Sequence, residues 1–318
     1  MSQAVEVAAA EPAGGPGAGR GTGVGDAAGL GRARAAAFTG PALLVIAIFL
    51  VFPALWTLYL GITDYRLTGL AAAHPHLVGV SNYANALRDP AFRSAAVRTF
   101  WYVLLSAVIG QNVLGFALAW TLRSARRWVR ATVEALVLLA WILPGVVGAW
   151  LWIAFLSHSG GTLNAILRTP GHDWLLDHPL GSLIVFNVWR GTAFSMMLLG
   201  AAIASVPPSQ LESARLAGAR GWRLLADAVF PRIRGHLLTN TLLISLWTFN
   251  DFTPYLLTGG GPSGASATLP VYIYLTALPG SRLGFASAIS LIVLVINLVL
   301  ALFYLRLLRR RTRGVRPA

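Results

Sequence analysis

Long apolar runs with few charged residues alternate along the chain with short polar or arginine-rich segments. An α-helix needs about 20 mainly apolar residues to cross the hydrocarbon core of a bilayer. Six runs reach this length, at residues 40–62, 97–122, 131–157, 179–205, 237–258 and 283–305. The pattern therefore predicts an all-α, polytopic membrane protein with six transmembrane helices.

The two ends of the chain are predicted to lie outside this transmembrane domain, which would span residues 36–308. Residues 1–35 are rich in Ala and Gly and cannot bury a core, so we expect a disordered tail. Residues 309–318 form a second, basic tail. The first apolar run is too long for the hydrophobic region of a signal peptide, so we expect it to be retained as a span.

Composition narrows the chemistry that the chain can carry. Only 11% of the 318 residues are charged, whereas soluble domains average about 25%. There is no Cys, which excludes disulfides, thiolate metal sites and a cysteine nucleophile. There is also no Lys, and the phosphate-binding loop of P-loop ATPases needs one. We therefore predict that this chain binds no metal or cofactor, and that ATP and Mg²⁺ would be bound by a partner ATPase if transport is uphill.

Arginine is distributed unevenly across the predicted membrane. Eighteen of the 25 Arg residues lie before the first span, in the loops after the second and fourth spans, or after the sixth. The positive-inside rule places this side in the cytoplasm, together with both termini. A nucleic-acid partner is disfavoured, because the basic residues border apolar spans instead of forming one accessible face.

The predicted cytoplasmic loop between the fourth and fifth spans is basic and has a helical pattern. Ser209 and Glu212 have the spacing of a capping box, which predicts that a helix starts at Ser209. Gly218 suits the C′ position at the end of that helix, and a second helix is expected from about Gly221. Pro231 would break this second helix or open the next span. By pattern alone, the loop is either an interfacial anchor or a docking helix for a soluble partner.

The stretch ESARLAGA in this loop, followed further on by a Pro, resembles the EAA loop of the inner-membrane permeases of binding-protein-dependent ABC importers. The family pattern is roughly E-A-A-x-x-D-G-A; here Ser213 replaces the middle Ala and Ala217 replaces the Asp. The resemblance implies that residues 206–236 form a coupling loop that seats in a cleft of the ATPase subunit. The residues implied in coupling are Glu212, Ser213, Ala214, Leu216, Gly218, Ala219 and Pro231.

Three further stretches resemble the sugar-importing branch of this family: FNDFTPYLLTGGGP at 249–262, VGVSNYANALRDPAF at 78–92 and ILPGVVGAWLWIAFLSHSGGTLN at 142–164. The order of the motifs is similar to that of the first permease of a pair. The resemblance implies a multi-pass permease subunit of the cell membrane that imports a sugar. It also implies the partners: a second permease subunit, as a heterodimer, two ATP-binding subunits and an extracytoplasmic solute-binding protein.

Polar residues inside the fourth and fifth spans are candidates for the solute pathway, because such residues usually face a bundle interior or an aqueous cavity. Asn187 and Phe194 share one helical stripe, and Thr248 and Asp251 share another. In maltose-type relatives the midmembrane sugar site lies on the corresponding spans. The candidate set is Asn187, Arg190, Gly191, Phe194, Thr248, Asn250, Asp251 and Tyr255. The alternative is that these polar groups only join helices, with Asp251 paired to Arg190.

Two other functions stay open at this point. A membrane enzyme, such as a lipid-linked glycosyltransferase, would need converging acidic residues at the membrane surface, and the loops offer only singly placed Asp residues. A permease for glycerol phosphate, polyamine or phosphate is the stronger alternative to a sugar permease. Glycerol phosphate importers share much of the LTGGGP pattern, and Arg190 would suit an anion. Gln111, in the second span, is interpreted as a packing contact and not as a ligand.

Overall fold

The computed structural model describes residues 32–312. Within this range the chain is helical apart from its loops and one β-bridge between Thr63 and Leu77, so the predicted all-α class is confirmed. The chain divides into two compact units, Met1–Ala54 and Leu55–Ala318. Residues 1–31 of the predicted N-terminal tail lie outside the described range, as do residues 313–318 of the predicted C-terminal tail.

The first helical run corresponds to the first predicted span. It consists of α1 (Arg32–Ile46), the π-helical segment η1 (Ala47–Val51) and α2 (Phe52–Gly61). Its portion Ala37–Gly61 is long and apolar enough to cross a membrane. Helix α1 already begins at Arg32, inside the segment for which a tail was predicted.

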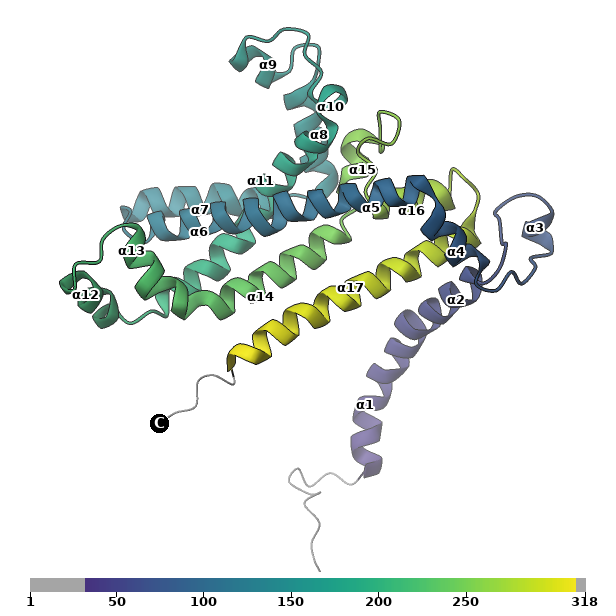
Figure 1. Ribbon diagram of the computed structural model, residues 1–318, viewed down its shortest axis with the longest axis horizontal. Coiled ribbons are helices and arrows are strands. Elements are labelled where there is room, and N and C mark those ends of the chain that lie inside the picture. Colours follow the sequence, from purple (N-terminus) through teal and green to yellow (C-terminus); the bar gives the residue numbers. More distant parts are fainter. Residues whose placement is uncertain (1–31, 313–318) are drawn as a thin grey trace, which may run out of the picture. The chain divides into compact units, whose positions relative to one another are not determined.

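Three more helical runs are also long and apolar enough to span a membrane (Figure 1). They are Pro90–Leu122, made of α5 (Pro90–Tyr102), η2 (Val103–Gln111) and α6 (Asn112–Leu122); α11 (Pro179–Ala204); and Leu283–Leu308 within α17 (Leu283–Thr312). The first of these starts earlier than the predicted residue 97 because Asp89 caps it. The Asp89 Oδ1 atom accepts the Ala91 N–H at 2.8 Å, and Pro90 occupies the first turn, where its missing N–H costs nothing.

The third predicted span, 131–157, is not one straight helix. It consists of α7 (Arg127–Ile142) and α8 (Gly145–Leu156), which meet at an angle of 106° (Figure 1). The break lies at Leu143 and Pro144. Proline cannot donate to the helical ladder and disfavours helical backbone in the residue before it; Leu143 accordingly has ψ 132°. The predicted third span is therefore bent in the middle, and the two helices count as one candidate span only if they are taken together.

The fifth predicted span, 237–258, is also divided. Helix α14 (Phe230–Phe249) ends before Asn250, and the short helix α15 (Thr253–Thr258) follows it. Helix α14 carries Arg232, Arg234 and several amide and hydroxyl side chains, and it is not among the described helices that qualify as spans. The described residues therefore provide four candidate spans, or five if the bent pair α7–α8 counts as one.

Short helices connect the spans. They are α3 (Leu70–Ala73), α4 (Ser81–Arg88), α9 (Thr162–Leu167), α10 (Trp174–Asp177), α12 (Pro208–Leu216), α13 (Trp222–Leu224), with the π-helical segment η3 (Leu225–Val229) after it, and α16 (Leu269–Ala277). Helix α4 is tied to the end of the first span, because the Asn82 side-chain amide donates to the Gly61 and Thr63 carbonyls at 3.1 and 2.8 Å.

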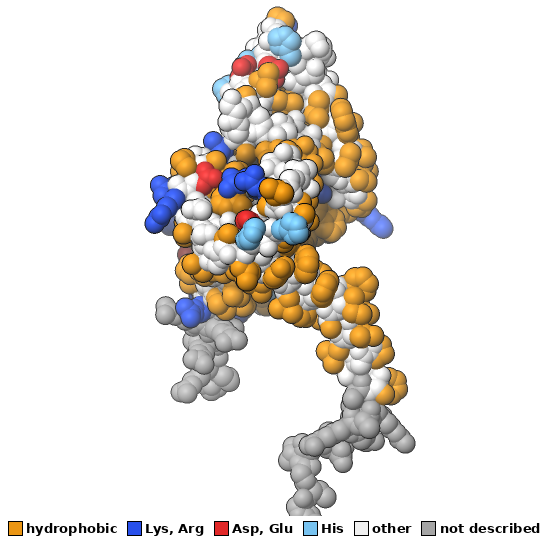
Figure 2. All heavy atoms as spheres, turned by 90° about the vertical axis from the view of Figure 1, so that its right-hand side faces the viewer, with side chains coloured by type: hydrophobic (Ala, Val, Ile, Leu, Met, Phe, Trp, Pro, Cys, Tyr) orange, Lys and Arg blue, Asp and Glu red, His pale blue; other side chains and the backbone are white. Residues whose placement is uncertain are grey.

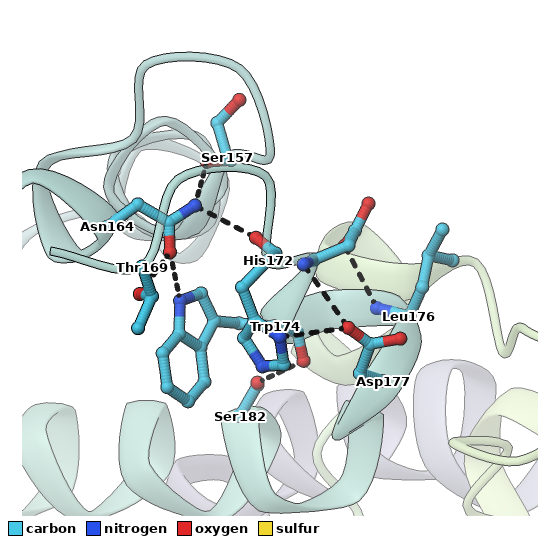
Figure 3. A network of polar contacts seen from close by, with 9 residues as sticks. Ser157, Asn164, Thr169, His172, Trp174, Leu176, Asp177 and Ser182 are labelled. Carbon is cyan, nitrogen blue, oxygen red and sulfur yellow. Dashed lines mark hydrogen bonds and ion pairs between the residues drawn. The ribbon is translucent and has the colours of Figure 1, made fainter. Parts of the chain in front are cut away.

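The loop between α8 and α11 is held by a network of polar contacts around Asn164 (Figure 3). The Asn164 amide donates to the Ser157 and His172 carbonyls, and its oxygen accepts the Trp174 indole N–H at 2.7 Å. The His172 Nδ1 atom lies 3.2 Å from the Asp177 carboxylate. These contacts satisfy the loop's polar groups internally, so α9 and α10 form an ordered extension of α8.

Helix α11 is the centre of the second unit and packs against α6, η2, α7 and α14. Glycine allows this close packing: a Cβ atom on Gly115 of α6 would lie 2.6 Å from the Ser195 Cβ of α11. The surface of the bundle stays apolar, as expected for a lipid-facing protein. Hydrophobic side chains cover much of the face in Figure 2, and on α17 Leu294 and Leu298 are more than half exposed.

Candidate functional site

A polar pocket of about 240 Å³ lies between α11, α14, η2 and α7. Residues from all four segments and Asp251, just after α14, line it: Gln111, Trp141, Asn187, Arg190, Gly191, Phe194, Ile244, Trp247, Thr248 and Asp251. It combines amide, hydroxyl and charged groups with aromatic rings. Polar cavities among apolar helices are costly and mark solute pathways in membrane proteins.

The amide of Asn187 on α11 joins three helical segments at the floor of the pocket. Its Nδ2 atom donates to Ser106 Oγ on η2 at 2.7 Å and to Thr248 Oγ1 on α14 at 3.2 Å. Asn187 is only 6% exposed, so both donor positions are used within the bundle. This hydrogen bonding orients the amide and leaves its oxygen as the group that a solute could use.

The charged groups of the pocket balance one another. Arg190 Nη1 lies 3.9 Å from Asp251 Oδ1, and both bond Thr253 Oγ1, at 2.9 and 2.6 Å. The second oxygen of Asp251 accepts the Tyr102 hydroxyl at 3.2 Å. The pairing of Asp251 with Arg190, anticipated from the sequence, is thus present. Asp251 lies in the break between α14 and α15. The Thr253 backbone N–H also donates to its carboxylate, at 3.0 Å, and helps to hold it beside Arg190.

Aromatic rings form the apolar wall of the pocket. Phe194 of α11 meets Trp247 of α14 edge-on, with ring centroids 4.7 Å apart, and it lies 6.2 Å from the Trp141 ring of α7. Trp141 belongs to α7, which packs against α11. Aromatic faces beside hydrogen-bonding groups are the two surfaces that a polyol or sugar ring needs.

Six of the eight candidate pathway residues line this pocket: Asn187, Arg190, Gly191, Phe194, Thr248 and Asp251. The other two do not. Asn250 is exposed and its amide bonds the Asn297 amide of α17 at 3.1 to 3.3 Å. Tyr255 stacks with Phe252 at a centroid distance of 5.1 Å and also packs on Tyr274, beyond the break.

Four lining residues were not among the candidates: Gln111, Trp141, Ile244 and Trp247. Gln111 was interpreted as a packing contact, and its Nε2 atom does donate to the Asn187 carbonyl at 3.0 Å. The same side chain also borders the pocket, and the Gln111 amide occupies the space that a Cβ on Gly191 would need. The sequence offered one signal for Gln111, which is a polar residue in an otherwise apolar span. The other three residues are apolar, and nothing in the sequence indicated that they line a pocket.

The predicted coupling loop forms a separate feature at the end of α11. Helix α12 begins at Pro208, one residue earlier than predicted, and the capping box is absent: Ser209 offers its carbonyl to Ser213 Oγ, and Pro207 occupies the cap position. Proline favours the first helical position, and this preference decides where the helix begins.

The predicted end of α12 at Gly218 is confirmed. Gly218 has φ +86°, its N–H donates to the Arg215 carbonyl, and the Ala219 N–H donates to Ala214 at 2.9 Å. This is the Schellman pattern, which satisfies the last carbonyls of a helix and favours glycine. The predicted second helix begins at Trp222, after Gly221, and runs through η3 into α14, so Pro231 opens the next helix.

Helix α12 is anchored on one side and exposed on the other. Leu211 packs on the core cluster that includes Ile203 and Val229. Glu212, Ser213 and Gly218 are exposed, and Leu216 is 90% exposed. The seven predicted coupling residues are not buried in the described structure, so this chain leaves the loop accessible to a partner.

The helical bundle, its apolar surface and its central polar pocket define a polytopic membrane transport protein. Residues 111–313, more than half of the chain, match the family described as the binding-protein-dependent transport system inner membrane component. The chain belongs to this family. It is therefore a permease-type transport subunit of the inner membrane and not an enzyme.

Individual relatives span nearly the same length. The sn-glycerol-3-phosphate permease UgpA of Agrobacterium fabrum is 28% identical over 281 residues, 85% of this chain and 93% of the relative. The diacetylchitobiose permease DasB of Streptomyces coelicolor is 27% identical over 298 residues, 88% and 90% of the two chains. A crystal structure of a bacterial ABC transporter that imports alginate contains a chain with the same fold. That chain has TM-score 0.73 and 24% identity, and the match covers 86% of this chain and 94% of that one.

Proposed function

We propose that the chain is the permease subunit of an ABC importer for an uncharged sugar, and that the solute passes through the pocket at α11 and α14. The observation that carries this proposal is the pairing of Arg190 with Asp251 inside the pocket. The paired charges cancel, so the pocket offers hydrogen-bonding groups and aromatic faces without a net charge. Such a surface favours a neutral polyol or sugar over an anion.

Import of glycerol phosphate is the second candidate, and the similarity to UgpA supports it. A phosphate needs an uncompensated cation, whereas Asp251 lies beside the one cation that lines the pocket. A permease for this solute would have to break the Arg190–Asp251 pair at each transport cycle. The cost of desolvating and separating a partly buried pair makes this the weaker candidate.

The assembly follows from the same proposal. This chain would span the membrane six times, with the α7–α8 pair as the third span, α14 and α15 as the fifth, and both termini in the cytoplasm. It would pair with a second permease subunit, two ATP-binding subunits and an extracytoplasmic solute-binding protein. ATP and Mg²⁺ would be bound by the ATPase subunits. Helix α12 would contact an ATPase subunit through Glu212 and the surface around Gly218, and would transmit the conformational change of that subunit to the bundle.

The experiment is ATPase stimulation in the complete complex, reconstituted with its binding protein and screened over sugars and glycerol phosphate. We expect stimulation by a neutral sugar. Stimulation by glycerol phosphate alone would replace the sugar assignment with the second candidate. If solute stimulates but variants of Asn187 and Thr248 transport normally, the pathway would lie outside this pocket.

A further inference from the structure

A second pocket, of about 480 Å³, lies between α6, α7 and α11 near the end of the bundle that carries α12. The lining residues are Ala119, Leu122, Arg123, Arg130, Glu134, Leu138, Met196, Met197, Gly200, Ala201, Ile203, Ala204 and Val206. One part is therefore apolar and the other is charged. None of these residues belongs to the polar pocket described above or to the predicted coupling set.

The charged part has a surplus of positive charge. Glu134 is the one carboxylate among the lining residues, and Arg130 Nε holds it at 2.8 Å. Arg123 takes part in no ion pair among the described residues; its guanidinium lies 3.4 Å from the centre of the Trp120 ring. Burial and the nearby Arg215 lower the pKa of Arg123 below its usual value. The guanidinium is therefore uncompensated, and its position beside a second cation favours an anion there.

The apolar part is suited to a hydrocarbon chain. Leu122, Leu138 and Ile203 contribute branched side chains, and Met196 and Met197 add unbranched, flexible ones that adapt to an irregular ligand. Helix α7 forms one wall, and elsewhere on this helix Leu136 and Leu139 are 63% and 55% exposed, as expected where a helix faces lipid. A soluble anion would use the guanidinium but not this wall.

We infer that this pocket binds an anionic phospholipid, with the headgroup phosphate at Arg123 and one acyl chain along the wall formed by Leu122, Leu138 and Met197. The ligand comes from the membrane leaflet at the α12 end of the bundle. Basic pockets between helices at a membrane surface bind such headgroups. Because the charge of Arg215 on α12 acts on Arg123, a phosphate bound at Arg123 also reduces the repulsion between the two guanidinium groups.

The test uses the full chain in its transporter complex, placed in nanodiscs of phosphatidylcholine with a minor fraction of phosphatidylglycerol. Lipid retained by the purified complex is measured by native mass spectrometry. We expect phosphatidylglycerol to be enriched over its bulk fraction, and Arg123→Gln to lower the enrichment about fivefold, the effect of one basic residue near an anionic headgroup. Glu134→Gln should raise it, because Arg130 is then freed to bind phosphate.

Arg126→Gln is the matched control, since Arg126 lies three residues away and does not line the pocket. Arg123→Gln should lower the enrichment of phosphatidylglycerol and Glu134→Gln should raise it, and these opposite changes distinguish lipid binding from misfolding.

Four outcomes would contradict or redirect the inference. Equal enrichment in Arg123→Gln and Arg126→Gln would overturn it, as would retention of phosphatidylcholine equal to that of phosphatidylglycerol. Displacement of the lipid by inorganic phosphate at equal concentration would also overturn it, because the pocket would then be a small-anion site. A transport defect without a change in retained lipid would assign the pocket to the solute instead.

Discussion

At the residue scale, the carboxylate of Asp251 connects several parts of the pocket. It accepts hydrogen bonds from Tyr102 and from the backbone and hydroxyl of Thr253, and it lies 3.9 Å from Arg190. These partners come from α5, α11 and the turn into α15. A single side chain thus fixes both the charge balance of the pocket and the direction in which the chain leaves α14.

Asp251→Asn keeps the shape of this side chain and removes its charge. Arg190 then has no counter-charge in the pocket, and we expect the KM for sugar uptake to rise about tenfold, since hydrogen bonds to charged groups contribute about 1.5–3 kcal/mol. Sensitivity to inhibition by glycerol phosphate should increase. Uptake is measured in proteoliposomes that contain the complete transporter at matched membrane abundance.

Asn250→Ala is the control for this prediction, because Asn250 is the neighbouring polar residue but bonds Asn297 outside the pocket. It should leave the uptake KM unchanged. If both variants behave alike, the effect belongs to the break after α14 and not to the charge of the pocket.

At the element scale, the contact between α6 and α11 depends on glycine at one point and not at another. A Cβ atom at Gly115 would meet Ser195 Cβ at 2.6 Å and the Met196 backbone nitrogen at 2.9 Å, whereas one at Gly200 would meet Ala119 Cβ at an ordinary 3.8 Å. We expect Gly115→Ala to destabilise the protein by about 1–3 kcal/mol through overpacking, and Gly200→Ala to be close to neutral. Thermal unfolding in detergent compares the two, and equal melting temperatures would show that α6 can move without cost.

The end of α12 has its own requirement. Gly218 has φ +86°, a conformation that costs a residue with a side chain roughly 1–2 kcal/mol, and a carboxylate at the C-terminal end of a helix is also unfavourable. Gly218→Asp should therefore distort the exposed surface of α12. We expect solute uptake to fall at least about tenfold, while the basal ATPase activity and membrane abundance of the complex persist.

Gly235→Asp adds the same charge on α14, where a Cβ meets nothing within 4 Å and φ is not positive. It should transport normally. Normal uptake by Gly218→Asp itself would remove the docking role from α12 and favour the alternative of an interfacial anchor.

At the scale of the whole molecule, the orientation predicted from arginine can be tested directly because the chain contains no Cys. Ser213 on α12 and Ser159 before α9 are both exposed and are predicted to lie on opposite sides of the membrane. A membrane-impermeant maleimide added to whole cells should label Ser159→Cys and spare Ser213→Cys. The opposite pattern would invert the topology and move α12 away from any cytoplasmic ATPase.

The sequence by itself determined the helical class, the apolar runs and the αL end of α12, because these depend on composition, hydrophobic length and local backbone preference. It also indicated six of the ten pocket residues, since polar groups inside apolar runs are visible as exceptions. The tertiary structure alone decided that Trp141, Ile244 and Trp247 join them, because apolar residues acquire a role only when helices distant in the chain meet. The bend after α7 has a local cause in Pro144, but its angle of 106° and the break after α14 are visible only in the structure. Hydropathy measures how well a segment suits the membrane interior. It does not determine where the backbone turns, because a turn needs neighbouring groups that satisfy the backbone N–H and C=O groups freed from the helix.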